Sequence, residues 1–520
     1  MAPLDRAVGS PPPRVRYELV AHACLLFEFA GFKVLTDPWL FGPCYYGSWW
    51  HYPKPSLAPE TLQDVDLIVI SHMHADHFHP PTLKRLPKHV PVWIPKLFFT
   101  EFRDRLRELG FRDVIEAQSG RRYALPQGIR ITSYSYRADD SAFVFEYGGR
   151  SWIHLNDCLL SGRTLARLRE RHAPVHTMFK IFVNAEAYPA CYDSEEPDEL
   201  RNWSPDSILD SFLETGELLQ PEYAVPYGGF VRSFHPEARP VNPTVARADR
   251  VLERAVETGR IRDRVRILLP GDAWSSESGF ALRARDPESE ARCLAEREDE
   301  VRADVQRICE DEKPAPEIFP LFESYFTEYL TRLPGVLRRK LDLRILFSTT
   351  DTNESCLLDL RRQRASVSRG SEPPEVHVQL SSALLESALT ERSWLFTLGS
   401  YRARIQLRAG ARSQEVLFWM SVFLFDASYF SFERFPVARM LSVLWARRVE
   451  FSEYAAHFVT GRFVSRHLEQ KFEQVTGATE PRGDESRPAE PAGRPPAPAH
   501  RARWWPTPTG LDAQESWKES

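Results

Sequence analysis

Three histidines and an aspartate occur within six residues, at His72, His74, Asp76 and His77. The apolar, β-branched stretch directly before them, Leu67–Ile70, predicts a buried strand. Imidazole and carboxylate are ligands of zinc, iron, manganese and cobalt, and a loop at a strand end can direct several of them to one point. A single histidine here is more often a core or loop residue, but four such groups close together are costly to bury without a cation. The pattern therefore predicts a metal site.

Two further polar residues are expected at the same edge of the sheet. The segments 17–20, 24–29 and 33–35 alternate and turn as antiparallel strands do. Asp37 follows the last of them and precedes a proline, so it is expected beside the histidine loop, unless it only caps a turn. His22 lies at the break between the first two strands, where contact with the metal or substrate and plain core burial are the alternatives.

The segment between Pro38 and Pro53 is aromatic and interrupted by glycine and proline. These breaks predict an irregular loop, although its side chains are too apolar to be left in water. We therefore expect this aromatic loop to line or cover a pocket. Trp49 and His51 are its candidates for contact with substrate or with the metal ligands.

Strands and helices continue after the histidine loop. Helices are predicted over 81–86 and 98–109, and strands over 91–95, 113–117, 129–136, 141–147 and 151–155. This alternation predicts an α/β fold with helices packed on a sheet. Asp157 follows the last of these strands, and Asp139 and Asp140 precede the strand that starts at 141.

Composition limits the classes of function. A net charge of −5 and a pI near 6.3 give no basic surface for nucleic acid. No apolar stretch is long enough to span a membrane, and residues 1–16 lack the apolar core of a secretory signal. Seven widely spaced cysteines form no Cys-x-x-Cys pair and no paired Cys-x-His motif, so we expect a reduced, cytoplasmic protein without a Rieske cluster.

The length of 520 residues predicts two domains and a tail. We expect a flexible N-terminus over 1–14, a catalytic domain over 15–285 and an exposed, charged linker helix over 286–315. An α+β domain is expected over 316–476, with helices over 318–333, 382–391 and 415–432. The Pro-rich tail over 477–520 has too little apolar surface to order itself and is predicted to be disordered.

The His-x-His-x-Asp-His pattern resembles the metallo-β-lactamase superfamily. The resemblance implies an αββα sandwich in which His72 and His74 bind one metal ion and Asp76 and His77 bind a second. It also implies that Asp157 bridges the two ions and that Asp37 supports the metal loop. The motifs Thr36-Asp37-Pro38-Trp39-Leu40, Gly42-Pro43 and Gly47-Ser48-Trp49-Trp50-His51 are similar to ascorbate-phosphate-lactonase-like proteins and CMP-N-acetylneuraminate hydroxylases. The C-terminal domain weakly resembles sterol-carrier-protein-2-like domains.

The chain departs from that family pattern at two ligands. The loop that usually supplies a third histidine offers Asp139 or Asp140, of which Asp140 is better placed. A carboxylate there shifts metal preference from zinc toward iron or manganese. The final histidine of the superfamily is replaced by Tyr227-Gly228-Gly229, and His235 is the nearest candidate for a ligand or substrate contact.

Three functions remain open at this point. The preferred hypothesis is a dinuclear, O2-activating oxygenase with two metal ions, iron favoured, that modifies a small-molecule biosynthetic intermediate and takes electrons from an external donor. Asp76 and Asp157 are its predicted catalytic carboxylates. The second hypothesis is a zinc or manganese hydrolase of the lactonase or phosphoesterase type, in which a metal-bound water attacks the substrate. The third is a non-catalytic protein that binds an apolar ligand.

Overall fold

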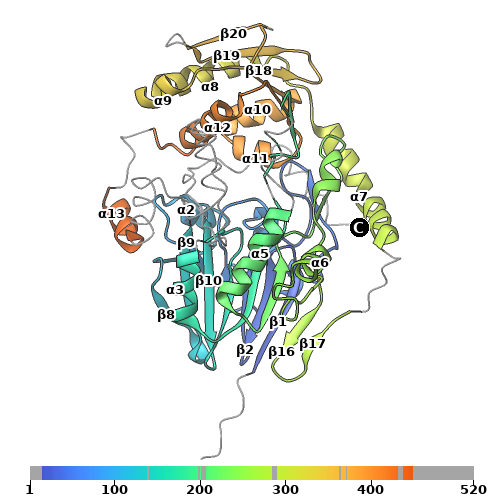
Figure 1. Ribbon diagram of the computed structural model, residues 1–520, viewed down its shortest axis with the longest axis vertical. Coiled ribbons are helices and arrows are strands. Elements are labelled where there is room, and N and C mark those ends of the chain that lie inside the picture. Colours follow the sequence, from blue (N-terminus) through green and yellow to red (C-terminus); the bar gives the residue numbers. More distant parts are fainter. Residues whose placement is uncertain are drawn as a thin grey trace, which may run out of the picture.

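The computed structural model describes residues 14–136, 140–160, 162–184, 186–196, 200, 206–283, 290–361, 365–370, 372–430 and 437–448. Residues 1–13 of the expected flexible N-terminus, the whole predicted Pro-rich tail over 477–520 and Asp139 lie outside these residues. In the described residues, β-strands form three large sheets and one two-stranded ribbon. Figure 1 shows the first two sheets in one half of the molecule and the third in the other half.

The first sheet carries the histidine loop. Its strands, in spatial order, are β17 (Gly279–Ala281), β16 (Ala273–Ser275), β1 (Val15–Ala21), β2 (Cys24–Phe29), β3 (Phe32–Thr36), β5 (Leu67–Val69), β6 (Val92–Pro95) and β7 (Val114–Ala117). Strands β3, β5, β6 and β7 run parallel to one another. Because parallel strands end at the same edge, the residues after β3 and β5 meet there, which places Asp37 beside the histidine loop.

The second sheet brings the carboxylates. Its strands, in spatial order, are β14 (Tyr223–Tyr227), β12 (Val175–Ile181), β11 (Arg150–His154), β10 (Asp140–Tyr147), β9 (Arg130–Tyr136) and β8 (Arg122–Ala124). Asp140 begins β10, and Asp157 follows the end of the neighbouring, antiparallel β11. The start of one strand and the end of its antiparallel neighbour lie at the same edge, so both aspartates reach the same end of this sheet.

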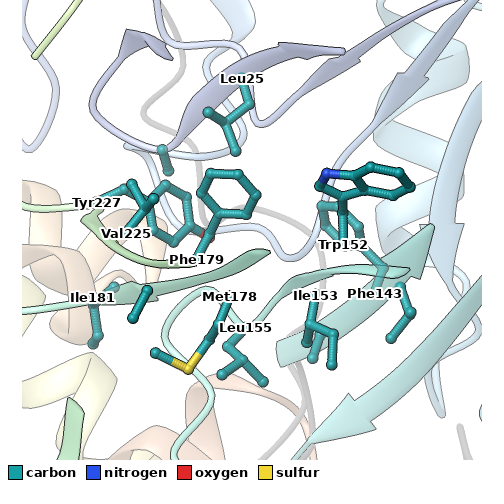
Figure 2. Packing of buried hydrophobic residues seen from close by; sticks show 14 of the residues in the cluster. Leu25, Phe143, Trp152, Ile153, Leu155, Met178, Phe179, Ile181, Val225 and Tyr227 are labelled. Carbon is teal, nitrogen blue, oxygen red and sulfur yellow. The ribbon is translucent and has the colours of Figure 1, made fainter. Parts of the chain in front are cut away.

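The two sheets pack face to face through one apolar core. Alternate residues of β2, such as Leu25 and Phe27, face Phe143, Trp152 and Phe179 of the second sheet. Figure 2 shows Leu25 of the first sheet above Phe179 and Tyr227 of the second. Burial of these large side chains fixes the spacing of the sheets, and with it the distance between the metal-ligating residues that each sheet carries.

Helices cover the outer faces of both sheets. On the first sheet these are α1 (Pro80–Arg85) and α2 (Glu101–Glu108), whose Leu83, Phe102 and Leu106 contact Ile68 and Ile94. On the second they are α3 (Gly162–His172), α5 (Asp206–Leu219) and α6 (Asp249–Thr258). The layers are therefore helix, sheet, sheet, helix, and the predicted αββα sandwich is confirmed.

The C-terminal half has a sheet and helices of its own. The sheet contains β13 (Tyr192–Ser194), β22 (Arg404–Leu407), β21 (Val376–Leu380), β18 (Arg344–Thr349), β19 (Ser355–Asp359) and β20 (Ser366–Arg369). The helices are α8 (Phe319–Arg332), α9 (Gly335–Lys340), α10 (Ser382–Glu391), α11 (Trp394–Gly399) and α12 (Arg412–Asp426). Helix α13 (Val437–Ala446) instead packs against the sandwich, where Arg439 donates to the carbonyl oxygens of Leu97 and Phe99 (Figure 1). Its edge strand β13 comes from the segment between β12 and α5, so the chain of the sandwich supplies a strand to the second unit.

The aromatic loop is fixed between the two halves. Its residues Trp49–His51 form strand β4, which pairs with β15 (Val231–Ser233), so the prediction of a wholly irregular loop was wrong. Trp39 and Trp49 belong to the same buried cluster as Phe322, Phe347 and Trp394 of the C-terminal half. The loop could be regular because backbone partners from β15, distant in sequence, satisfy its hydrogen bonds.

Arg402 is the main buried charge between the halves, with 1% of its side chain exposed. Its guanidinium donates to Glu237 at 2.6 Å, to both carboxylate oxygens of Glu312 and to the carbonyl oxygen of Tyr46 at 3.1 Å. Glu237 lies in the segment after β15, Glu312 directly follows helix α7 (Glu290–Asp311), and Tyr46 belongs to the aromatic loop. One side chain thus joins three separate segments.

Helix α7 (Glu290–Asp311) corresponds to the predicted linker helix. It is not simply exposed, because Val301 is buried against Trp50 and Phe234 and Arg297 donates to the carbonyl oxygen of His51. The charged sequence did not predict this contact, because only one narrow face of the helix is apolar. Among the described residues, no helix has the length and hydropathy needed to cross a membrane.

We predict that Arg402→Met lowers the free energy of unfolding by about 2 kcal/mol, because Glu237 and Glu312, whose side chains are 33% and 28% exposed, would lose their shared cation and its charge-assisted hydrogen bonds. Urea unfolding measures this loss. Arg369→Met is the matched control, since Arg369 and its partner Glu317 are 53% and 58% exposed and such pairs contribute less than about 1 kcal/mol. Equal losses in the two variants would contradict the central role of Arg402.

Candidate metal centre

The histidine loop closes on itself directly after β5. The backbone N–H groups of His77 and Phe78 both donate to the carbonyl oxygen of His74, at 3.0 and 2.7 Å. This turn brings Asp76 and His77 back toward His72, so that four side chains close in sequence face one region. A helix could not direct consecutive ligands in this way, as its side chains at i and i+2 point to different faces.

The first group of metal-ligating atoms consists of His72, His74 and Asp140, which offer ligand atoms within 4.8 Å of one another. His72 Nε2 lies 2.8 Å from His74 Nδ1 and 3.6 Å from Asp140 Oδ1. Asp140 thus occupies the position for which the sequence offered Asp139 or Asp140. The structure brings it to the site because β10 starts directly beneath the histidine loop, where the Ser141 hydroxyl donates to the carbonyl oxygen of Ser71.

The second group consists of Asp76, His77 and His22, again with ligand atoms within 4.8 Å of one another. Asp76 Oδ2 lies 3.4 Å from His77 Nε2 and 3.0 Å from His22 Nε2. His22 comes from the turn between β1 and β2. The structure thus places the His22 ring beside Asp76 and His77.

Asp157 lies between the two groups. Its Oδ2 is 3.6 Å from His72 Nε2, and its Oδ1 is 3.5 Å from His77 Nε2. The preceding residue, Asn156, has a φ of 52° and holds the bend through its side chain, which donates to the carbonyl oxygen of Ser141 and accepts from the Tyr227 hydroxyl. Asp157 is therefore placed to share its two oxygens between two cations.

A set of outer hydrogen bonds orients the imidazoles. Asp37 accepts from the backbone N–H of Ser71 at 2.7 Å, from its hydroxyl at 2.9 Å and from His77 Nδ1 at 3.1 Å. The Ser71 oxygen in turn lies 2.8 Å from His72 Nδ1. With both Nδ1 atoms engaged, His72 and His77 present Nε2 to the centre, as metal-ligating histidines do. Nε2 of His77 is buried and has no hydrogen-bond partner in the described residues.

The electrostatics of the cluster favour a cation. Burial holds the pKa of His72 well below its ordinary value, which keeps the ring neutral and able to bind a metal. Burial alone would raise the pKa of Asp76, but His77 and His22 hold it well below its usual range. Burial would lower the pKa of His77, yet Asp76, Asp157 and Asp37 raise it well above its usual value. A proton on His77 and a metal ion therefore compete for the same Nε2.

The residues fit two metal ions. Ligands bound at 2.0–2.2 Å to one ion lie about 3.0–3.5 Å apart. On one side His72 Nε2 lies 2.8–3.6 Å from ligand atoms of His74, Asp140 and Asp157. On the other side the contacts from His22 to Asp76, from Asp76 to His77 and from His77 to Asp157 measure 3.0–3.5 Å, so both sets are close to that spacing. The two groups share Asp157, so the arrangement is that of a dinuclear centre.

The other predicted site residues have different positions. His235 is buried, with Nε2 3.5 Å from Cys309 Sγ and 4.0 Å from Glu312, and the structure does not bring it into either group of ligands. His51 packs on Trp39 at 3.7 Å between ring centroids, and its Nε2 lies 2.9 Å from the carbonyl oxygen of Trp39. Trp49 lies behind the second group, 6.5 Å from His22.

Tyr45 contacts the cluster in a way that the sequence did not reveal. Its hydroxyl donates to Asp76 Oδ1 at 2.8 Å, and burial raises its pKa, so it remains a donor. Its ring lies 5.9 Å from that of Phe396 in α11, which is itself 6.5 Å from His74. The aromatic composition of the loop was visible in the sequence, but nothing indicated which ring reaches a metal ligand. The φ of 49° at Tyr45, set by tertiary contacts, decides it.

Among the described residues of the cluster, His74 and Asp157 are the most exposed. The side chains of His74 and Asp157 are 25% and 18% exposed, whereas those of the other five cluster residues are exposed by 6% or less. The C-terminal half borders this more exposed side through Phe396. A substrate would therefore approach past His74 and Asp157, along a boundary formed by both halves of the chain.

Comparison with known proteins agrees with this fold and site. Residues 16–170 match a family model described as the β-lactamase superfamily domain. Residues 16–170 therefore form a metallo-β-lactamase superfamily domain, and the His and Asp cluster described above lies within them.

Individual relatives cover only part of the chain. Over 255 residues it is 25% identical to cytidine monophosphate-N-acetylneuraminic acid hydroxylase of Mus musculus, covering 45% of this chain and 42% of the relative. The chain thus spans less than half the length of that relative.

Two solved structures are similar. The metallo hydrolase Igni18 of Ignicoccus hospitalis is 17% identical, with a TM-score of 0.35 over 50% of this chain and 98% of its own. The diiron β-hydroxylase CmlA of Streptomyces venezuelae is 19% identical, with a TM-score of 0.33 over 51% and 54%. The predicted sterol-carrier-like character of the C-terminal half finds no support among these comparisons.

We predict that Asp37→Asn weakens metal binding about 10 to 100-fold, because the outer partner that orients His77 is lost. Competition with a chelator of known affinity measures the change. The control is Asp272→Asn, a buried carboxylate that accepts from the backbone N–H groups of Leu269 and Arg283 instead. Equal weakening in both variants would show that general destabilisation, and not ligand orientation, is responsible.

Proposed function

We propose that this chain is a dinuclear metal-dependent oxygenase that holds two iron ions and hydroxylates a small-molecule biosynthetic intermediate. One observation carries the proposal, namely the position of Asp140 beside His72 and His74. A third imidazole at this position would favour zinc. The carboxylate found there makes the donor set richer in oxygen, and such sites prefer iron or manganese. The name of the murine relative, a hydroxylase, supports the same class of reaction.

Bound iron would supply the activation of O2, and the residues of this chain would provide the surroundings for that chemistry. Asp157 and Asp140 supply negative charge that stabilises the higher charge of oxidised ions. Tyr45 holds Asp76 in place, and the adjacent aromatic side chains Trp49 and Phe396 exclude water from one side of the centre. We also propose that a separate protein donates the electrons.

A metal-dependent hydrolase is the second candidate, and one observation favours it. Asp157 lies beside both His72 and His77 on the partly exposed side of the centre, where a carboxylate can accept the proton of an attacking water. In that case zinc or manganese would be the metal, and lactones or phosphoesters the substrates. The identity of the metal separates the two candidates.

We expect protein produced in iron-supplemented medium to contain about two irons per chain, magnetically coupled through the shared Asp157, because each group of ligands fits one ion. Elemental analysis and Mössbauer spectroscopy measure the count and the coupling. His74→Ala removes a ligand and should abolish the coupled signal.

His235→Asn is the matched control. It replaces a buried histidine that lies outside both groups, so it should retain both irons. Stoichiometric zinc that iron cannot replace would contradict the oxygenase and direct the search to hydrolytic substrates. Loss of iron in His235→Asn to the same extent as in His74→Ala would restore His235 as a ligand.

A further inference from the structure

The turn between β1 and β2 directs His22 into the centre. The pairing of these strands is regular from Val15 to Leu19 and shifts between Leu19 and Ala21. Such irregularities re-aim side chains next to functional sites. His22 follows the shift directly, is 1% exposed, and has no hydrogen-bond partner for Nδ1 among the described residues. His22 differs in this respect from His72 and His77, whose Nδ1 atoms are engaged, and among the described residues it is Nε2 of His22 that faces a polar partner, Asp76.

From this geometry we propose that His22 is a ligand of the second metal ion, through Nε2. The proposal rests on the dinuclear centre proposed above and names one ligand more than the His-x-His-x-Asp-His pattern supplies. His22 Nε2 lies 3.0 Å from Asp76 Oδ2, and the ligand atoms of His22, Asp76 and His77 lie within 4.8 Å of one another. This is the spacing expected of neighbouring ligands on one ion.

With His22 included, the two halves of the centre become chemically equal. The first half has His72, His74 and Asp140, and the second has His22, His77 and Asp76. Each half therefore offers two imidazoles and one carboxylate of its own, and both share Asp157. Without His22, the second ion would have a single imidazole. Equal donor sets give the two ions equal ligand charge and softness, which suits a pair of ions of the same element.

A backbone hydrogen bond holds the turn that carries His22 beside the centre. The N–H of Gly228, directly after β14 of the second sheet, donates to the carbonyl oxygen of His22 at 2.8 Å. Gly228 has a φ of +71°, and a Cβ there would approach Ile181 to 2.8 Å, so the position favours glycine. The residues Tyr227-Gly228-Gly229 thus hold the turn of the first sheet against the centre instead of supplying a side chain. The imidazole of His22 therefore comes from the first sheet, and not from the second sheet that carries Tyr227-Gly228-Gly229.

A competing role for His22 is that of an outer partner, which only donates a hydrogen bond to Asp76. The two roles differ in magnitude and in spectroscopy. Loss of an outer partner weakens metal binding by about 10 to 100-fold, and an added imidazole would not then bind the metal. Loss of a ligand weakens the second ion further and leaves an open position that an added imidazole can fill.

The test uses the full chain loaded with Co²⁺ or Cu²⁺. We expect two tightly bound ions in the wild type. In His22→Ala one ion should remain at its original affinity while the second weakens by more than 100-fold. Added 15N-imidazole should restore the second ion, with the strong hyperfine coupling of a directly bound nitrogen in pulsed EPR of the Cu²⁺ form. His79→Asn is the matched control, because His79 is equally buried and caps α1, a role that asparagine fulfils, but lies outside both groups.

Each outcome decides one question. Two ions of unchanged affinity in His22→Ala, or restoration without hyperfine coupling to the added imidazole, would overturn the ligand assignment and leave His22 as an outer partner. A wild type that binds no metal, or only one ion, would instead contradict the dinuclear centre itself. Loss of metal in His79→Asn as well would attribute the effect to general destabilisation.

Discussion

Three carboxylates, the buried Asp76 and Asp140 and the partly exposed Asp157, meet four imidazoles at one edge of the sandwich, and this concentration of charge is the constraint on which the site depends. Ionised carboxylates so deep in a protein are tolerated only when a cation offsets their loss of hydration. The raised pKa of His77 shows how the chain compensates without metal, by favouring a proton where an ion would bind. The pair of sheets holds these groups together, because the ligands come from both sheets and the core between them fixes their separation.

The C-terminal half is part of the same arrangement. It receives strand β13 from the sandwich, while its own Arg402 and Phe396 contact the aromatic loop. That loop carries Tyr45, whose hydroxyl holds Asp76. The position of a metal ligand therefore depends on contacts made by residues more than 300 positions later in the chain. This dependence gives a physical reason for both halves to occur in one polypeptide, since the second half completes the surroundings of a centre that the first half builds.

The residues of the centre differ in how local their origin is. His72, His74, Asp76 and His77 come from one turn whose geometry follows from the backbone hydrogen bonds to His74. Asp140, Asp157 and His22 each come from a different strand end. A local turn can hold its ligands in place even while the rest of the domain relaxes, whereas the remaining ligands require both sheets to be paired and packed. Metal binding should therefore report on the folding of the whole sandwich.

The sequence alone predicted the class of fold, which is confirmed, and most members of the His and Asp cluster that the structure brings together. Strand periodicity and the His-x-His-x-Asp-His spacing are local properties, and Asp37 and Asp157 could be placed because each directly follows a strand that ends at the site. Tertiary structure decided the rest. It placed Asp140 in the cluster through the register of β9 and β10, and His22 through an irregularity in the pairing of β1 and β2. It placed His235 beside Cys309 and paired part of the aromatic loop with β15. It also brought the hydroxyl of Tyr45 to Asp76. Each of these depends on contacts between residues far apart in the chain, and composition and spacing carry no record of which distant partner a side chain will meet.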